Sequence, residues 1–246
     1  MIDNCNSSFS KYLFATNFFE FNMVKDYNSK KMKQITDKEV SFLKKYIDDK
    51  NSNILDIMCG YGRLANEMYD FGYKKINGID LHNFEFIGEI KKFKFFNENF
   101  FNWSSNEKYK YCYSLYNSYG NLEDFLKVIN RSSSIVENGG LLIIDIFNKK
   151  WRDSLSRCTY RIIYENAIEK VELFRFYDGV IEKSVYIFSC GGKTRQFSYS
   201  QCVVSKEQLY KSIPNDWDVY ITDSSVENTR DDDQKNILIL RKKVKK

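Results

Sequence analysis

The stretch that decides the fold is NILDIMCGYGRLANEMYDFGYKKINGIDLH, residues 53–82. It contains a short apolar run, a glycine turn with Gly60 and Gly62, a segment with helical spacing, and a second apolar run that ends at Asp80. A strand, a glycine turn, a helix and a second strand form the unit that binds nucleotides at the carboxyl edge of a parallel sheet. Asp56 precedes the glycines, however, and its carboxylate would repel a pyrophosphate at this turn.

The same alternation continues on both sides of this stretch, from residue 37 to residue 148. Asp37 is predicted to cap a helix over residues 38–47. An almost wholly apolar run at 139–147 is typical of a strand in the buried middle of a parallel sheet. We therefore predict an α/β fold with a doubly wound Rossmann-like sheet. The expected strands are 53–58, 75–81, 92–100, 110–120 and 139–147, and the further helices are 62–72 and 122–136.

The pattern changes after residue 160. Three long β-type runs, 160–177, 180–190 and 194–204, are joined by Asp178-Gly179 and by residues 191–193, which are hairpin signals. They predict an inserted antiparallel β subdomain. A helix over 206–213 and strands over 217–223 and 235–243, with the acidic loop 227–234 between these strands, then return the chain to the main sheet. The expected divisions are an N-terminal helical lid (1–36), the α/β domain (37–150), the inserted subdomain (151–204) and the return (205–246).

Composition and charge indicate which partners, metals and cellular location to expect. The net charge of +5 lies largely in the last six residues and in scattered lysines, so we expect no nucleic-acid partner. Six widely spaced cysteines and one histidine do not form a metal-binding pattern, and we expect no metal. No signal peptide and no apolar run of membrane-spanning length is evident, so we expect a cytoplasmic protein with free thiols and no membrane association.

The two acids identify a ligand class. Parallel strands present their carboxyl ends at one edge, so Asp56 and Asp80 are expected to lie near each other. A carboxylate at the glycine turn suits an ammonium group, and a carboxylate after the second strand accepts hydrogen bonds from two ribose hydroxyls. S-adenosylmethionine carries both groups, whereas NAD does not carry the ammonium.

At these residues the chain resembles the class I S-adenosylmethionine-dependent methyltransferases. LDIMCGYGR (55–63) is similar to their first motif and GIDL (78–81) to their second. SLYNSYGNLED (114–124) and NGGLLIIDIFN (138–148) resemble the fourth and fifth strands of a bacterial subgroup that methylates small molecules. The resemblance covers most of the chain, and the combination of motifs is more specific than any one motif.

The resemblance implies the cofactor site residue by residue. Met58 stands where the family usually has its first glycine, and its side chain is expected to point away from the ligand. Asn99 stands where the family usually has an aspartate that contacts adenine. The implied contacts to S-adenosylmethionine, whose product is S-adenosylhomocysteine, are made by Tyr27, Asp56, Met58, Gly60, Gly62, Asp80, Leu81, Asn99, Phe100 and Leu115.

The scarcity of histidine indicates which kind of methyl acceptor to expect. Alcohols usually require a histidine base, and the single histidine, His82, follows the ribose-binding segment on the side away from an acceptor. This favours an amine nitrogen, as in an amino sugar or a peptide-derived natural product, and a mechanism that depends on proximity without a dedicated catalytic residue. The alternatives are O-methylation of a carboxylate or phenol, a non-catalytic cofactor-binding module, and an RNA methyltransferase if the lysines cluster.

The acceptor pocket is expected beyond the fourth and fifth strands. The subgroup that the chain resembles methylates amino sugars bound to nucleotides or the N-termini of modified peptides, which implies a small-molecule or short-peptide acceptor. A monomer or homodimer is expected. The candidate pocket residues are Tyr12, Asn117, Tyr119, Asp145, Asn148, Trp151 and Arg152.

Overall fold

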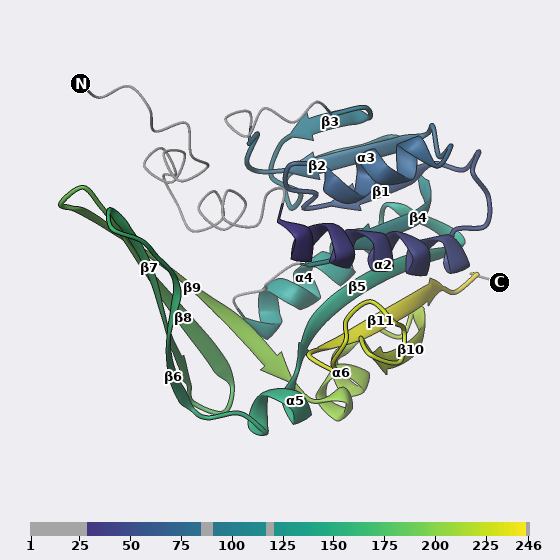
Figure 1. Cartoon of the computed structure of the whole chain (residues 1–246). Helices are drawn as coiled ribbons and strands as arrows, with labels where there is room; N and C mark the ends of the chain where they lie inside the picture. The colour runs from purple at the N-terminus through teal and green to yellow at the C-terminus, as the bar shows by residue number, and fades with distance from the viewer. Residues whose placement is uncertain (1–28, 85–90, 117–120, 245–246) are drawn as a thin grey trace.

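The computed structural model describes residues 29–84, 91–116 and 121–244, and its centre is a mostly parallel sheet (Figure 1). Adjacent strands follow the order β3-β2-β1-β4-β5-β11-β10. The first five are mutually parallel, whereas β11 runs antiparallel to β5. The strand order reverses between β1 and β4, where α/β proteins bind ligands. The strands are β1 (Ile54–Ile57), β2 (Ile76–Asp80), β3 (Lys94–Asn97), β4 (Tyr109–Ser114), β5 (Val136–Asn148), β10 (Trp217–Asp223) and β11 (Lys235–Lys242).

Helices cover both faces of this sheet. Helices α2 (Lys30–Tyr46) and α3 (Arg63–Asp70) pack on one face in a buried cluster with Ile54 of β1. Helices α4 (Leu122–Ser133) and α6 (Lys206–Ser212) contribute to the cluster that contains Leu55. Neighbouring residues of one strand point to opposite faces, so these two clusters are the two halves of a doubly wound core. The predicted fold class is confirmed.

The start of helix α2 differs from the prediction. The helix begins at Lys30, and Ser29 is its N-cap, accepting a hydrogen bond from Met32 N at 3.0 Å. Asp37 lies inside the helix and does not cap it, so that prediction is wrong. The first turn contains lysines and no acid, the reverse of the usual preference at a helix N-terminus, which is why the sequence pattern hid this start.

The inserted segment forms four antiparallel strands where the sequence indicated three runs. They are β6 (Cys158–Glu165), β7 (Glu169–Tyr177), β8 (Ile181–Cys190) and β9 (Lys193–Val204). The run 160–177 is divided by a hairpin, in which the Asn166 side chain accepts hydrogen bonds from Ile168 N and Glu169 N. A single asparagine supplies this turn, without the glycine that marks the other two turns.

Strand β9 joins the inserted strands to the central sheet. Phe147 and Asn148, the last residues of β5, pair in parallel with Val203 and Val204. Strand β11 occupies the other edge of β5, so β9 lies on the same edge as β4 but beyond the point where β4 ends. The inserted sheet therefore rises past the carboxyl end of β4, as the green arm in Figure 1 shows. Helix α5 (Lys149–Asp153) follows β5 at this junction.

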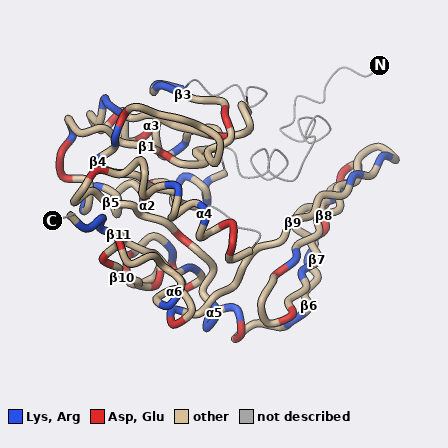
Figure 2. The backbone as a smooth tube through the Cα atoms, turned by 180° about the vertical axis from the view of Figure 1, so that it is seen from behind, with Lys and Arg blue, Asp and Glu red and all other residues tan. Residues whose placement is uncertain are grey.

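Charges of both signs are distributed over the surface. Lys and Arg are intermixed with Asp and Glu along the described part of the chain and do not form a single stripe there (Figure 2). In the part of the chain that the structure describes, no helix combines the length and apolar character needed to cross a membrane.

Candidate functional site

The turn after β1 is built from left-handed backbone conformations. The φ angles of Met58, Gly60 and Gly62 are 56°, 58° and 87°. A Cβ on Gly62 would lie 2.6 Å from the Phe93 ring, so this position has both the conformation and the close approach that require glycine. Met58 adopts a conformation that costs a side-chain-bearing residue energy, and it packs against the core cluster on one face of the sheet.

Asp80 connects the tips of β1 and β2. One carboxylate oxygen accepts a hydrogen bond from Gly60 N at 2.8 Å, and the other accepts one from His82 N at 2.8 Å. Burial raises the pKa of this carboxyl group, although the two backbone donors oppose the rise. Leu81 follows with an exposed fraction of 60% and presents an apolar side chain at the same edge. The pair thus offers a carboxylate acceptor next to an apolar surface.

Asp56 is a buried acid at the carboxyl end of β1. It is 3% exposed, and burial raises its pKa well above the usual range. Arg63 and the Tyr113 hydroxyl favour its charged form, whereas Asp80 and Glu39 disfavour it. A bound cation would lower this pKa, because it would compensate the charge that burial penalises. The environment therefore fits the ammonium or sulfonium of S-adenosylmethionine and does not fit a pyrophosphate.

Three of the remaining predicted cofactor residues are described by the structure, and they follow the carboxyl ends of β3 and β4. Asn99 is exposed, and its side-chain oxygen accepts a hydrogen bond from Phe101 N at 2.9 Å, which orders the turn after β3. Phe100 and Leu115 are buried, with Leu115 directly after β4. Tyr27 lies outside the described residues. Their roles as cofactor contacts stay predictions.

A network of buried charges lies beside this edge. Glu39 of α2 binds Arg63 of α3, and its other oxygen accepts a hydrogen bond from Arg230 at 2.9 Å. Burial would raise the pKa of Glu39, but the two guanidinium groups outweigh it and the pKa is lowered. Lys235 forms an ion pair with Asp145 at 3.1 Å. The network fixes α2, α3 and the loop before β11 relative to one another.

Tyr116, the residue after β4, lies between these cations. The distances from its ring centroid to Arg63, Arg230 and Lys235 are 5.2, 4.9 and 5.7 Å. Its backbone N–H donates to Asp145 at 3.0 Å, and its φ is 66°. The ring is thereby held at the carboxyl end of β4, on the floor of a cavity.

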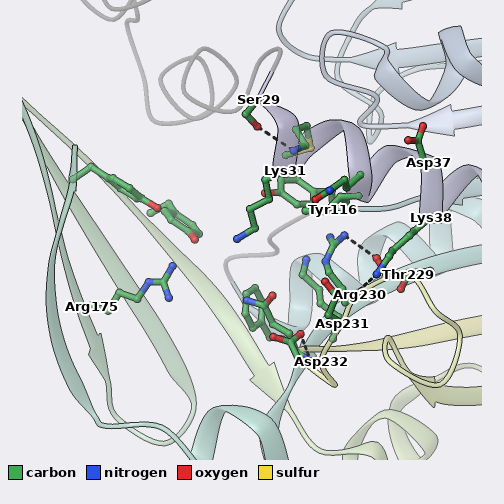
Figure 3. Close-up of a pocket in the computed structure, with 18 residues that line it drawn as sticks. Ser29, Lys31, Asp37, Lys38, Tyr116, Arg175, Thr229, Arg230, Asp231 and Asp232 are labelled. Atoms are coloured by element: carbon green, nitrogen blue, oxygen red, sulfur yellow. Dashed lines mark hydrogen bonds and ion pairs between the residues drawn. The ribbon is translucent and has the colours of Figure 1, made fainter. Parts of the chain in front are cut away.

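This cavity, of about 750 Å³, lies between helix α2, the inner face of the inserted sheet and the loop before β11 (Figure 3). The volume is in the range of small-molecule sites. Its walls carry tyrosines, lysines, arginines and aspartates. It is lined by Ser29, Lys31, Met32, Gln34, Ile35, Asp37, Lys38, Tyr116, Phe147, Arg175, Tyr186, Tyr199, Thr229, Arg230, Asp231, Asp232, Gln234 and Lys235.

The four predicted acceptor residues that the structure describes lie at the base of the inserted sheet, outside this lining. Asp145 binds Lys235, and Asn148 donates to Asp223 and to the carbonyl of Asp233, both at 2.9 Å. Trp151 packs against the cluster of Phe147, Tyr177 and Val203, while Arg152 is 1% exposed and pairs with Glu182. Their side chains hold the junction together, and acceptor contact remains a prediction. Tyr12, Asn117 and Tyr119 lie outside the described residues.

The sequence prediction missed the cavity residues of α2, β7–β9 and the loop 227–234. This loop was recognised only as an acidic connection. One signal was present in the sequence: Arg175 is a charged residue among the alternate apolar positions Val171, Leu173 and Tyr177 of β7.

A family model described as "Methyltransferase domain" matches residues 27–183. The chain belongs to this family. The predicted methyltransferase and its cofactor class, S-adenosylmethionine, are thereby confirmed. No curated protein matches the sequence at a significant level.

Solved structures share the fold at low sequence identity. The CcbJ methyltransferase from Streptomyces caelestis superposes with a TM-score of 0.70 at 14% identity, over 85% of this chain and 90% of that one. An S-adenosylmethionine-dependent methyltransferase from Clostridium acetobutylicum gives 0.71 at 14%, over 97% and 100%. CalS10, an amino pentose methyltransferase from Micromonospora echinaspora, gives 0.62 at 9%, over 90% and 95%. These similarities establish the fold.

Proposed function

We propose that the chain transfers the methyl group of S-adenosylmethionine to an amine nitrogen of a small molecule, such as an amino sugar or a peptide-derived natural product. The observation that supports this most strongly is the composition of the cavity wall. The described residues that line it include tyrosines and aspartates but no histidine. A neutral amine attacks without a strong base, whereas an aliphatic alcohol usually needs one.

The location of the cavity supports the same reaction. Tyr116 and Phe147, at the ends of β4 and β5, belong to its lining, and Asp80 lies at the same edge of the sheet. When bound, S-adenosylmethionine supplies an electrophilic methyl group. The protein would hold the acceptor in line with it, and proximity of this kind contributes up to about 7–11 kcal/mol. Named relatives in the fold comparison include an amino pentose methyltransferase and a glycopeptide N-methyltransferase.

His82 supports this assignment by its position. It follows β2, and its ring contacts Phe84 with the ring centroids 5.7 Å apart. It is not among the residues that line the cavity. We infer a cytoplasmic enzyme of small-molecule biosynthesis, and we place no nucleic acid or membrane among its partners.

The test is methyl transfer from isotope-labelled S-adenosylmethionine to matched acceptors. Each primary or secondary amine in the panel is paired with its N-acetyl and hydroxyl analogues. We expect labelled product from free amines only, identified as N-methyl by mass spectrometry. Transfer to phenols or carboxylates alone would contradict the proposal, and binding of S-adenosylhomocysteine without any turnover would favour a non-catalytic module.

A further inference from the structure

Arg175 lies on the mostly buried face of strand β7 in the inserted sheet, next to apolar residues of the same strand. Its neighbours on the same face of β7, Val171, Leu173 and Tyr177, are 1%, 3% and 6% exposed. A strand with one buried face normally keeps that face apolar, so a charged residue there requires a compensating partner. The side chain of Arg175 is 27% exposed and lines the cavity.

The register places polar groups around this arginine. Arg175 pairs with Ser184, which in turn pairs with Tyr199, so the three residues form one row across β7, β8 and β9. The Tyr186 side chain forms a hydrogen bond with Arg175. Burial lowers the pKa of the guanidinium, but Glu182 and the two tyrosines outweigh it and the pKa is raised. Arg175 therefore keeps its charge in this environment.

The nearest carboxylate compensates that charge only weakly. Glu182 lies 3.9 Å from Arg175 Nε, beyond hydrogen-bonding distance. Its oxygens already accept bonds from the buried Arg152 and from Gln201 Nε2, the latter at 2.7 Å. Arg175 Nε has no hydrogen-bond acceptor among the described residues.

A second cation faces Arg175 across the cavity. Lys31, in the first turn of α2, extends into the space between the helix and the inserted sheet, and its end points toward Arg175 (Figure 3). The aspartates of the cavity, Asp37, Asp231 and Asp232, lie on the opposite side in this view. The side next to the sheet is thus locally positive.

The other cations of the cavity have closer acidic partners. Lys38 pairs with Asp231, Arg230 pairs with Glu39 at 2.9 Å, and Lys235 pairs with Asp145 at 3.1 Å. Within the described residues, Lys31 has no carboxylate oxygen within 4.0 Å. The charge of Lys31 contributes only at longer range, as one of the causes that lower the pKa of Asp231. Among the described cations of the cavity, Arg175 and Lys31 therefore have the most distant acidic partners.

We propose that the methyl acceptor carries an anionic oxygen group, a carboxylate or a phosphate, which Arg175 and Lys31 bind at the sheet side of the cavity. The planar guanidinium matches two oxygens of such a group, and the tyrosine hydroxyls supply further donors. This inference rests on the proposed function, because it assigns the cavity to the acceptor. The anionic group would orient the amine toward the carboxyl end of β4.

The direct test uses sodium acetate and sodium phosphate as probes of the full chain, with sodium chloride at equal ionic strength as reference. Binding is followed by two-dimensional NMR of the backbone amides and arginine Nε–H groups. We expect saturable shifts around residues 173–177 and 184–186. In Arg175→Gln the affinity should fall about tenfold or more, because the substitution removes a charge-assisted contact to the anion.

Arg175→Lys keeps the charge and should lose less affinity than Arg175→Gln. The matched control is Lys183→Gln, which removes one positive charge from an exposed position that pairs with Phe176 on the other face of the sheet. It should leave the affinity unchanged. Retained binding of S-adenosylhomocysteine shows that each variant is folded.

Saturation by acetate alone assigns a carboxylate, and saturation by phosphate assigns a phosphate ester. Absence of saturable shifts with both probes, or equal affinities in Arg175→Gln and the unmodified chain, overturns the inference. Because anion binding is measured without methyl transfer, failure of the amine assay does not affect this result. Conversely, if the chain methylates amines but neither probe binds saturably, the proposed function is supported and the anion site is contradicted.

Discussion

At the scale of single residues, the turn after β1 has left-handed backbone conformations next to two acidic side chains. Asp80 holds Gly60 N and His82 N with its two oxygens, which joins the tips of β1 and β2. Asp56 is buried nearby with a raised pKa. A cationic nucleoside would compensate both acids, so we expect binding of such a ligand to stabilise the turn.

Replacement of Asp80 by alanine should weaken S-adenosylhomocysteine binding about tenfold or more, because it removes charge-assisted acceptors worth roughly 1.5–3 kcal/mol each. Isothermal titration calorimetry measures the affinity. Asp70→Ala, which removes an exposed acid of α3 that pairs with Lys92, is the control and should have no effect. An unchanged affinity in Asp80→Ala would remove this residue from ribose recognition.

Met58 allows a test of backbone strain. Its φ of 56° is left-handed, so glycine should be favoured over alanine at this position by about 1–2 kcal/mol. Both substitutions lose the same packing of the methionine side chain, to within one methyl group. Urea unfolding of Met58→Gly and Met58→Ala measures the difference. A more stable alanine variant, as in ordinary right-handed backbone, would contradict this interpretation.

At the scale of secondary-structure elements, α2 is fixed by a buried ion pair as well as by its apolar face. Glu39 is 2% exposed and joins α3 and the loop before β11 through Arg63 and Arg230. Removing one partner leaves uncompensated buried charge, which typically costs about 3–5 kcal/mol.

Glu39→Gln should therefore lower the free energy of unfolding by about 3 kcal/mol at pH 7. The pKa of Glu39 is lowered in the folded protein, so its contribution is present above the unfolded pKa of about 4.3 and is lost as the pH falls through the folded value. The difference between the two proteins should shrink below about pH 4. Urea unfolding at several pH values measures it. The exposed Glu67→Gln on α3 is the control, and a pH-independent difference would contradict the ion-pair interpretation.

At the scale of the whole molecule, charge is dispersed and the sheets create the cavity. Basic and acidic residues are intermixed along the described backbone (Figure 2). The cavity exists because the inserted sheet continues from β5 on the β4 edge and rises opposite α2. Helix α2, the inserted sheet and the loop before β11, which are far apart in the sequence, thus line the same cavity.

Dispersed charge predicts weak binding to nucleic acid. A short single-stranded RNA should bind with a dissociation constant of about 100 µM or weaker at physiological salt, which is the weak limit of non-specific binding. Fluorescence anisotropy at several salt concentrations measures the affinity. Tight binding with a steep salt dependence would indicate an RNA acceptor and contradict the small-molecule assignment.

The sequence alone determined the central sheet, the family, and the glycine turn and acidic residues at the carboxyl ends of β1 and β2. These features depend on local patterns: alternation of helix and strand periods, glycines at left-handed positions, and acids at strand ends. The missed start of α2 and the missed hairpin at Asn166 were also local, but their signals were weak, since lysines fill the first helical turn and no glycine marks that hairpin.

Only the tertiary structure decided the cavity between α2, the inserted sheet and the loop before β11. Lys31, Arg175 and Asp231 are separated by long stretches of chain and meet because β9 pairs with the end of β5 and the loop before β11 folds against α2. The same packing occupies Asn148 and Arg152 in the junction. Local sequence patterns carry information about neighbours along the chain and along one strand or helix, whereas the pairing of distant strands determines which side chains face a common space.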